Sequence, residues 1–230
     1  MLTLTFFTVL IYNIGKVKKH LTYFLYKSKK IIILIFLPLI VIISQVFHLQ
    51  GESKMRVLLK AEEYQKVLPR LAAEIIEKED IEKLAIVGIR RRGDFLGIRL
   101  KKLLQEKVNI DIPIGAIDIN LYRDDLSSLS EFPEIKETDI PFDITGKTVL
   151  LVDDVLYTGR TIRAALNALF DYGRPKKVSL LVLVDRFGRE LPVSANYVGL
   201  ALNVPQDQYV SVRVKELEGE DLVLLKDKAN

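Results

Sequence analysis

The amino-acid sequence predicts an α/β fold in which a central, mainly parallel sheet is flanked by helices. Apolar runs typical of buried strands occur at residues 84–89, 148–152 and 178–184. Segments with apolar side chains at helical spacing lie between these runs. This alternation is typical of a parallel sheet with helices on both faces, and it puts the ligand site at the carboxyl ends of the strands.

The first half of the predicted domain contains two helices and two strands. Residues 60–78 carry apolar side chains at helical spacing, although Pro69 interrupts the pattern and suggests a later start. Strand 84–89 is followed by a basic turn and by helix 95–104, and the next strand covers residues 114–121. Both strands are therefore expected to end at the ligand edge of the sheet.

The second half repeats this order. Strand 148–152 precedes helix 162–172, which Gly173 ends, and strand 178–184 follows. Residues 209–214 alternate between apolar and polar side chains, which predicts a strand in a smaller subdomain.

A long loop separates the two halves. Residues 123–143 are polar, contain two prolines and show no periodicity. Loops of this length in compact domains often cover an active site. Its first residue, Arg123, could close over a leaving group while the loop excludes water, so we count Arg123 among the catalytic candidates.

The composition restricts the chemistry that such a domain can perform. The chain has 230 residues, 49% of them hydrophobic, which is enough for a globular core. It has no cysteine, and its two histidines, His20 and His48, both precede Met55. Residues 55–230 therefore cannot supply a cysteine nucleophile, a thiolate metal site or histidine acid–base catalysis.

The first 54 residues differ in charge from the rest. They contain seven lysines and one acid, Glu52, whereas residues 55–230 contain 27 basic and 29 acidic side chains. The net charge of +4 thus comes from the N-terminal segment. Overall charge is consequently no indication that residues 55–230 bind nucleic acid.

Two interpretations of residues 1–54 remain open. Residues 31–47 form an uncharged apolar run near the lower length limit of a transmembrane helix, so the segment could be a membrane anchor. The composition changes abruptly before Met55, the only internal methionine, which instead favours translation from that residue. We adopt the second interpretation, which predicts a cytoplasmic domain at 55–230 without a membrane partner.

The motif richest in chemistry follows strand 148–152. Asp153 and Asp154 are paired carboxylates, which can accept hydrogen bonds from vicinal hydroxyls or hold a hydrated Mg²⁺. Residues 158–161, Thr-Gly-Arg-Thr, supply hydroxyls and backbone N–H groups at a helix N-terminus, where a phosphate is favoured. The motif therefore predicts a binding site for a ribose and its phosphate.

A second basic motif follows strand 84–89. Arg90, Arg91 and Arg92 precede a glycine and a helix, and three guanidinium groups there can neutralise a pyrophosphate.

Together these motifs resemble a known family. The run VDDVLYTGRT resembles the phosphoribosyl-pyrophosphate (PRPP) signature of type I phosphoribosyltransferases. The runs VGIRRRG, GAIDINLYRDDL and VDRFGRELP, in this order, are similar to those of bifunctional pyrimidine-operon regulators that are also uracil phosphoribosyltransferases. The resemblance covers the chain from about Met55 to its C-terminus.

The resemblance implies a type I phosphoribosyltransferase fold with a small hood subdomain, and a reaction that needs no covalent nucleophile. Ribose 5-phosphate passes from PRPP to N1 of uracil, giving UMP and pyrophosphate with Mg²⁺ as cofactor. Asp153 and Asp154 would hold the ribose, and the metal indirectly through PRPP, while Arg123 would cover the pyrophosphate. The implied phosphate-binding residues are Arg91, Arg92, Val155, Leu156, Tyr157, Thr158, Gly159, Arg160 and Thr161. The implied base-binding residues are Asp185, Arg186, Arg189 and Val204, with the small subdomain near 197–204.

The same resemblance implies a regulatory activity and a homodimer or larger oligomer. Members of this family bind the leader of pyrimidine biosynthetic mRNA when UMP or UTP is present, so that transcription terminates early. Arg70 and Lys78 are the RNA-binding candidates, but a domain of charge −2 has few cations to neutralise phosphates, so we rank attenuation below catalysis. Two alternatives stay open: a nucleotide-sensing RNA regulator without catalysis, and a phosphoribosyltransferase for another base.

Overall fold

A computed structural model describes residues 55–122 and 138–228. Its main sheet has five parallel strands in the order β3-β2-β4-β5-β6. These strands are β2 (Leu84–Ile89), β3 (Ile114–Ile117), β4 (Thr148–Leu156), β5 (Lys177–Arg186) and β6 (Tyr197–Leu202). The predicted α/β class with a parallel sheet is confirmed.

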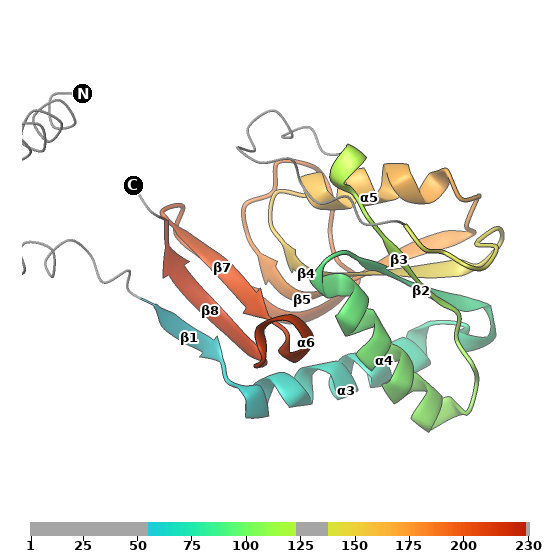
Figure 1. The fold of residues 1–230 in the computed structure, drawn as a ribbon, viewed down its shortest axis with the longest axis horizontal. Helices are drawn as coiled ribbons and strands as arrows, with labels where there is room; N and C mark the ends of the chain where they lie inside the picture. Colours follow the sequence, from blue (N-terminus) through green and yellow to red (C-terminus); the bar gives the residue numbers. More distant parts are fainter. Residues whose placement is uncertain (1–54, 123–137, 229–230) are drawn as a thin grey trace, which may run out of the picture. The chain divides into compact units, whose positions relative to one another are not determined.

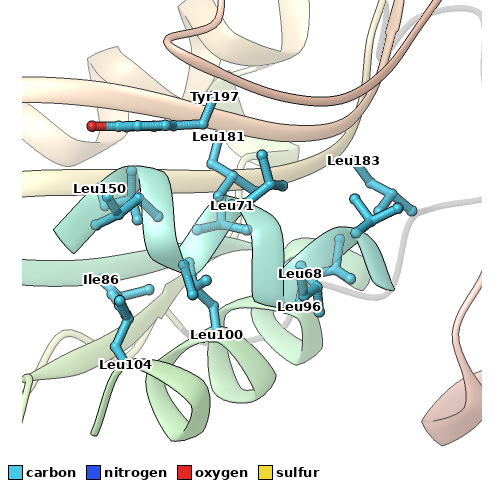
Figure 2. Close-up of a cluster of buried hydrophobic side chains, with 14 of the residues drawn as sticks. Leu68, Leu71, Ile86, Leu96, Leu100, Leu104, Leu150, Leu181, Leu183 and Tyr197 are labelled. Atoms are coloured by element: carbon cyan, nitrogen blue, oxygen red, sulfur yellow. The ribbon is translucent and has the colours of Figure 1, made fainter. Parts of the chain in front are cut away.

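Helices cover both faces of this sheet. Helices α3 (Ala61–Lys78) and α4 (Arg92–Val108) lie against one face, and α5 (Arg160–Phe170) lies against the other (Figure 1). Because consecutive side chains of a strand point to opposite faces, Leu150 of β4 packs in the α3/α4 core and Leu151 in the α5 core. Figure 2 shows the first core, where leucines of α3 and α4 interdigitate with side chains of the sheet. Burial on both faces explains why the central strands are continuously apolar.

A second, antiparallel sheet forms the small subdomain. Its order is β1-β8-β7, with β1 at Arg56–Leu59, β7 at Gln208–Arg213 and β8 at Leu222–Asp227. The short helix α6 (Lys215–Glu218) connects β7 to β8. The strand expected at 209–214 is thus confirmed within one residue. Strands β1 and β8, which the sequence analysis did not predict, come from the two ends of the described chain and pair with each other in the folded structure.

Several element boundaries differ from those expected. Strand β4 continues to Leu156, so the acid pair lies within the strand and not after it. Helix α4 begins at Arg92 and so includes one of the predicted phosphate ligands. Strand β3 ends at Ile117 and is followed by a single 3-10 turn at Asn120–Tyr122. The hydrophobic pattern of β4 stops at Val152 because the next two residues are acids. The backbone nevertheless continues to pair with β5 as far as Leu156, so the strand is longer than its apolar run.

Two expectations for this domain were wrong. Pro69 does not delay the start of α3, which is continuous from Ala61 and buries Val67, Leu68 and Leu71 against the core. Packing of that apolar face outweighs the local cost of the proline. Residues 197–202 are not in the small subdomain, because β6 pairs in parallel with β5 as the edge strand of the main sheet.

Residues 1–54 lie outside the described residues, and with them the predicted transmembrane candidate at 31–47. Within 55–122 and 138–228, no helix has the length and apolar character needed to cross a bilayer.

Candidate active site

The acid pair lies at the carboxyl end of the central strand β4. By the alternation of that strand, Asp154 points to the α4 side and Asp153 to the α5 side. Each carboxylate accepts a hydrogen bond from the next backbone N–H: Asp153 from Asp154 at 2.9 Å, and Asp154 from Val155 at 2.8 Å. These local bonds fix both carboxylates at the ligand edge of the sheet.

Both carboxylates are costly to ionise. Asp153 is only 5% exposed, and burial together with the neighbouring Asp154 charge raises its pKa well above the usual aspartate value. Burial also raises the pKa of Asp154, although the Arg92 guanidinium opposes that shift. Ionising both carboxyls is therefore opposed by burial and by their mutual repulsion, and a cationic group close to the pair favours their charged forms, as Arg92 does for Asp154.

The loop after β4 leads directly into α5. Gly159 precedes the helix with φ of 93°, a left-handed conformation that glycine adopts readily, and a Cβ there would come within 3.2 Å of Leu191 Cβ. The Thr158 carbonyl accepts the backbone N–H groups of Glu190 and Leu191, both at 3.0 Å. The predicted phosphate loop is therefore held against the loop that follows β5, with the N-terminus of α5 at its end.

Arg189 fastens this loop to the end of β5. Its Nη1 donates to the carbonyls of Tyr157 at 2.7 Å and Arg186 at 2.8 Å, and more weakly to Leu156 at 3.4 Å. Its Nη2 donates to the Asp185 carboxylate, and its Nε to a further backbone carbonyl. Since its donors are engaged in this way, two of the predicted base ligands, Arg189 and Asp185, form a structural clamp at the edge of the site.

The other predicted base ligands, Arg186 and Val204, lie at the end of β5 and in the segment after β6; we call this surface the wall of the site. Arg186 is 3% exposed, its guanidinium stacks 4.0 Å above the centroid of the Tyr157 ring, and its Nη2 donates to the Pro205 carbonyl at 2.8 Å. Its Nε is buried without a hydrogen-bond partner. Val204 is buried as well, at 8% exposure. The wall therefore combines one apolar side chain with one incompletely satisfied guanidinium.

The remaining phosphate ligands of the prediction differ in how they are placed. Leu156 is buried in the α5 core, so only its backbone can face a ligand. Arg160 donates from Nε to Glu190 at 2.7 Å, and both side chains are about half exposed. Thr158 and Thr161 are half-buried on either side of Gly159.

The basic motif lies beside the acid pair. The N-terminus of α4 packs tightly on β4: a Cβ on Gly93 would come within 2.2 Å of the Val152 carbonyl oxygen. This approach brings Arg92 Nη1 to 3.6 Å from Asp154 Oδ2. Arg91, the residue before the helix, is exposed, and the Arg90–Arg91 peptide bond is cis. The structure thus joins the two motifs that the sequence predicted separately.

Arg92 has a second partner that the sequence analysis missed. Glu218 of α6 accepts from Arg92 Nη2 at 2.7 Å and from Nε at 3.1 Å. Burial alone would raise the pKa of Glu218, but the Val214 N–H and the Arg92 guanidinium outweigh burial and lower it. No local sequence pattern marks this contact, because 126 residues separate the two side chains.

Arg123, the predicted pyrophosphate cover, lies outside the described residues together with 124–137. The turn before it is ordered by its own side chains: Asp118 accepts the Asn120 N–H at 2.8 Å, and the Tyr122 hydroxyl donates to Asp171 beyond α5.

The two RNA-binding candidates lie on α3. Arg70 donates from Nη2 to the carbonyls of Val198 and Gly199, at 3.0 and 2.7 Å, and so covers the edge strand β6. Glu74 pairs with both Arg70 and Lys78, at 2.7 and 3.8 Å. The positive charge of this surface is therefore partly offset.

Comparison with known proteins assigns the family. The family profile "Phosphoribosyl transferase domain" matches residues 58–218. The chain therefore belongs to the phosphoribosyltransferase family. It is 51% identical over 170 residues to the bifunctional protein PyrR of Elusimicrobium minutum, covering 74% of this chain and 95% of that protein. It is 49% identical over 172 residues to PyrR of Thermus aquaticus, with 74% and 95% covered. Within the family it is thus one of the PyrR proteins.

Solved structures agree with this fold. A hypoxanthine phosphoribosyltransferase from Staphylococcus aureus superposes with a TM-score of 0.55 at 24% identity, covering 75% of this chain and 92% of that one. A hypoxanthine-guanine-xanthine phosphoribosyltransferase gives 0.54 at 21% identity, with 75% and 94% covered. At these identities the likeness concerns the fold alone, and it confirms the predicted type I phosphoribosyltransferase architecture.

Proposed function

We propose that this chain transfers ribose 5-phosphate from PRPP to N1 of uracil, forming UMP and pyrophosphate. The observation that carries the proposal is the acid pair at the end of β4, directly continuous with the Thr-Gly-Arg-Thr loop at the start of α5. Membership among the PyrR proteins, whose name describes them as bifunctional, supports the same activity.

The chain's own residues supply positioning and electrostatics for this reaction. Asp153 and Asp154 hold the ribose hydroxyls and balance the positive charge that develops as the glycosidic bond to pyrophosphate breaks. Residues 155–161 hold the 5-phosphate through backbone N–H groups and hydroxyls at the start of α5. The pyrophosphate group is bound by the guanidinium groups of Arg91, Arg92 and Arg123. The bond that breaks joins C1 of the ribose to pyrophosphate oxygen, and the bond that forms joins C1 to N1 of uracil, whose proton leaves to solvent.

Mg²⁺ fits this site as a metal carried mainly by the substrate. Within the described ranges, no group of three or more His, Cys, Asp or Glu side chains could enclose a metal ion. Two adjacent carboxylates are a donor set for a hydrated Mg²⁺ that takes its other ligands from phosphate oxygens and water. When bound, the ion would neutralise the leaving pyrophosphate, with Asp153 and Asp154 contacting it through PRPP.

Uracil would bind against the wall formed after β5. Arg186 and Val204 lie there, and Asp185 and Arg189 set the position of its backbone. A pyrimidine presents two carbonyl oxygens and one N–H, which backbone groups of this wall can match. The charged substrate of the reaction also leads us to propose a cytoplasmic location and, from the family, a homodimer or larger assembly.

The test is pyrophosphate release by the full chain from PRPP and MgCl₂, with uracil, hypoxanthine and guanine in parallel. We expect release with uracil alone. Release with a purine base but not uracil would establish a phosphoribosyltransferase for another base. No release with any base from a folded protein that binds UMP would favour a nucleotide-sensing regulator without catalysis.

The second activity of this proposal is attenuation of pyrimidine biosynthesis through leader mRNA, in response to UMP or UTP. Membership among the PyrR proteins supports it, and Arg70 and Lys78 are its proposed RNA contacts. Because both cations pair with Glu74, we expect weak binding with a shallow dependence on salt. Gel shifts with the leader RNA of the source organism, with and without UMP, test this. Binding that is unaffected by Arg70→Gln and Lys78→Gln together would exclude these contacts.

A further inference from the structure

Helix α6 is fixed to α4 by ion pairs. Its segment carries four carboxylates, and each pairs with an arginine of another element. Glu216 and Asp221 pair with Arg99 of α4, Glu218 with Arg92 of α4, and Glu220 with Arg213 of β7. Of these pairs, the one with Arg92 adjoins the acid pair of β4.

The Glu218 carboxylate is held from both of its oxygens. Oε1 accepts from Arg92 Nη2 at 2.7 Å and from Nε at 3.1 Å, and Oε2 accepts the backbone N–H of Val214 at 2.8 Å. The side chains of Glu218 and Arg92 are 25% and 34% exposed, so water screens their attraction less than it would on an open surface.

This contact decides which edge of the guanidinium faces the acid pair. With Nε and Nη2 bound to Glu218, only Nη1 is directed to Asp154, at 3.6 Å, beyond ordinary hydrogen-bond length. An arginine without Glu218 could instead form a bidentate bond to Asp154, the strongest arrangement available to the two groups. That bond would occupy the carboxylate that the ribose hydroxyls require.

We propose that Glu218 is a positioning residue for PRPP: it holds the Arg92 guanidinium beside Asp154 while keeping that carboxylate available to the ribose. This inference rests on the proposed function, in which Arg92 and Asp154 bind PRPP. Glu218 itself touches no substrate, and it acts through Arg92 from a different subdomain.

The test measures the dissociation constant of PRPP for the full chain in MgCl₂ by calorimetry, together with the KM for PRPP and kcat at saturating uracil. Glu218→Gln keeps the size of the side chain and an acceptor for Val214 but loses the charge. We expect PRPP to bind about tenfold more weakly, as for the loss of one charge-assisted hydrogen bond, with kcat changed less than about threefold. Glu218→Asp should restore part of the affinity.

Two controls separate positioning from stability. Glu216→Gln removes a carboxylate from the same helix that pairs with Arg99, so it should lower the melting temperature comparably without changing the PRPP affinity. In an Arg92→Gln background, Glu218→Gln should cause no further loss, because coupled residues are not additive.

Unchanged or tighter binding by Glu218→Gln would overturn the inference, as would a full additional loss in the Arg92→Gln background. A wild-type chain that binds PRPP but transfers ribose to no base would refute the proposed catalysis, while the affinity comparison would still decide the role of Glu218. A wild-type chain that does not bind PRPP would overturn both.

Discussion

At the scale of single residues, Asp154 combines partial burial, a nearby arginine and a place at the end of the central strand. Asp154→Asn keeps the shape of the side chain but removes the carboxylate that we propose binds the ribose hydroxyls. We expect kcat to fall by about 100-fold or more, the size of effect seen when one preorganised electrostatic group is lost. Because burial already disfavours the charge, stability at pH 7 should not fall.

Steady-state rates and urea unfolding at pH 7 check this pair of expectations. Unchanged turnover would remove Asp154 from the ribose role. A loss of rate that accompanies unfolding would show that the carboxylate serves the fold instead.

Gly93 makes a second prediction at this scale. A Cβ at this position would lie 2.2 Å from the Val152 carbonyl oxygen, a backbone atom that cannot rotate away. Gly93→Ala should therefore push the start of α4 from β4 and cost about 1–3 kcal/mol, a typical overpacking penalty. At Gly97 of the same helix the nearest atom is the Ile86 Cγ2 methyl at 3.2 Å, so Gly97→Ala should cost less. Chemical denaturation of both variants decides whether the close approach, or simply added bulk, is responsible.

At the scale of elements, the carboxyl end of β5 and the loop after β4 act as one unit because Arg189 joins them. Arg189→Lys keeps the charge but cannot reach the carbonyls of Tyr157 and Arg186 and the Asp185 carboxylate together. We expect the loop to loosen, with the KM for PRPP rising about tenfold and the melting temperature falling by several degrees.

The matched control is Glu190→Gln, which removes an exposed ion pair between the residue after Arg189 and Arg160 at the start of α5. Exposed pairs contribute about 0–1 kcal/mol, so this variant should stay near wild type in both measurements. Equal effects of the two substitutions would show that Arg189 has no special part in holding the loop.

At the scale of the whole molecule, α3 is tied to the sheet through one buried acid at its C-terminus. Glu79 is 4% exposed at its side chain and accepts from Lys177 at 2.8 Å, Ser179 at 2.8 Å and the Tyr197 hydroxyl at 2.9 Å. Burial alone would raise the pKa of Glu79, but the hydrogen bonds to these three residues lower it overall. This network joins α3 to β5 and β6 at the edge opposite the acid pair.

The lowered pKa sets the pH window of this contribution. The folded state favours the ionised carboxylate, so the stabilisation is fully present above the unfolded pKa of about 4.3 and is lost as pH falls through the folded value. Glu79→Gln should cost about 1–3 kcal/mol at pH 7, and its difference from wild type should shrink below about pH 4. Unfolding free energies at pH 7, 5 and 3.5 measure this.

Glu74→Gln is the comparison for this prediction, since it removes an acid of the same helix with partly exposed partners, Arg70 and Lys78. It should change stability by less than about 1 kcal/mol at each pH. A constant Glu79→Gln penalty from pH 7 to 3.5 would contradict the assigned role of its charge.

The sequence by itself determined the parts of this protein whose signal is local. Continuous apolar runs specified β2, β4 and β5, because strands buried on both faces cannot alternate with polar residues. The acid pair and the Thr-Gly-Arg-Thr loop are adjacent in the chain, so their juxtaposition needed no tertiary information. The same holds for the fold class, which follows from the order of strands and helices.

Only the tertiary structure decided contacts between distant segments. The place of β6 beside β5, the clamp of Arg189 and the pairing of Glu218 with Arg92 all depend on which segments the sheet order brings together. In the sequence, Glu218 looks like any solvated acid of a charged run, and only the folded chain places it against Arg92 of α4. Hydrophobic periodicity records whether a residue is buried, but it carries no information about the partner that it meets, and for that reason the positioning of Arg92 is a property of the folded chain alone.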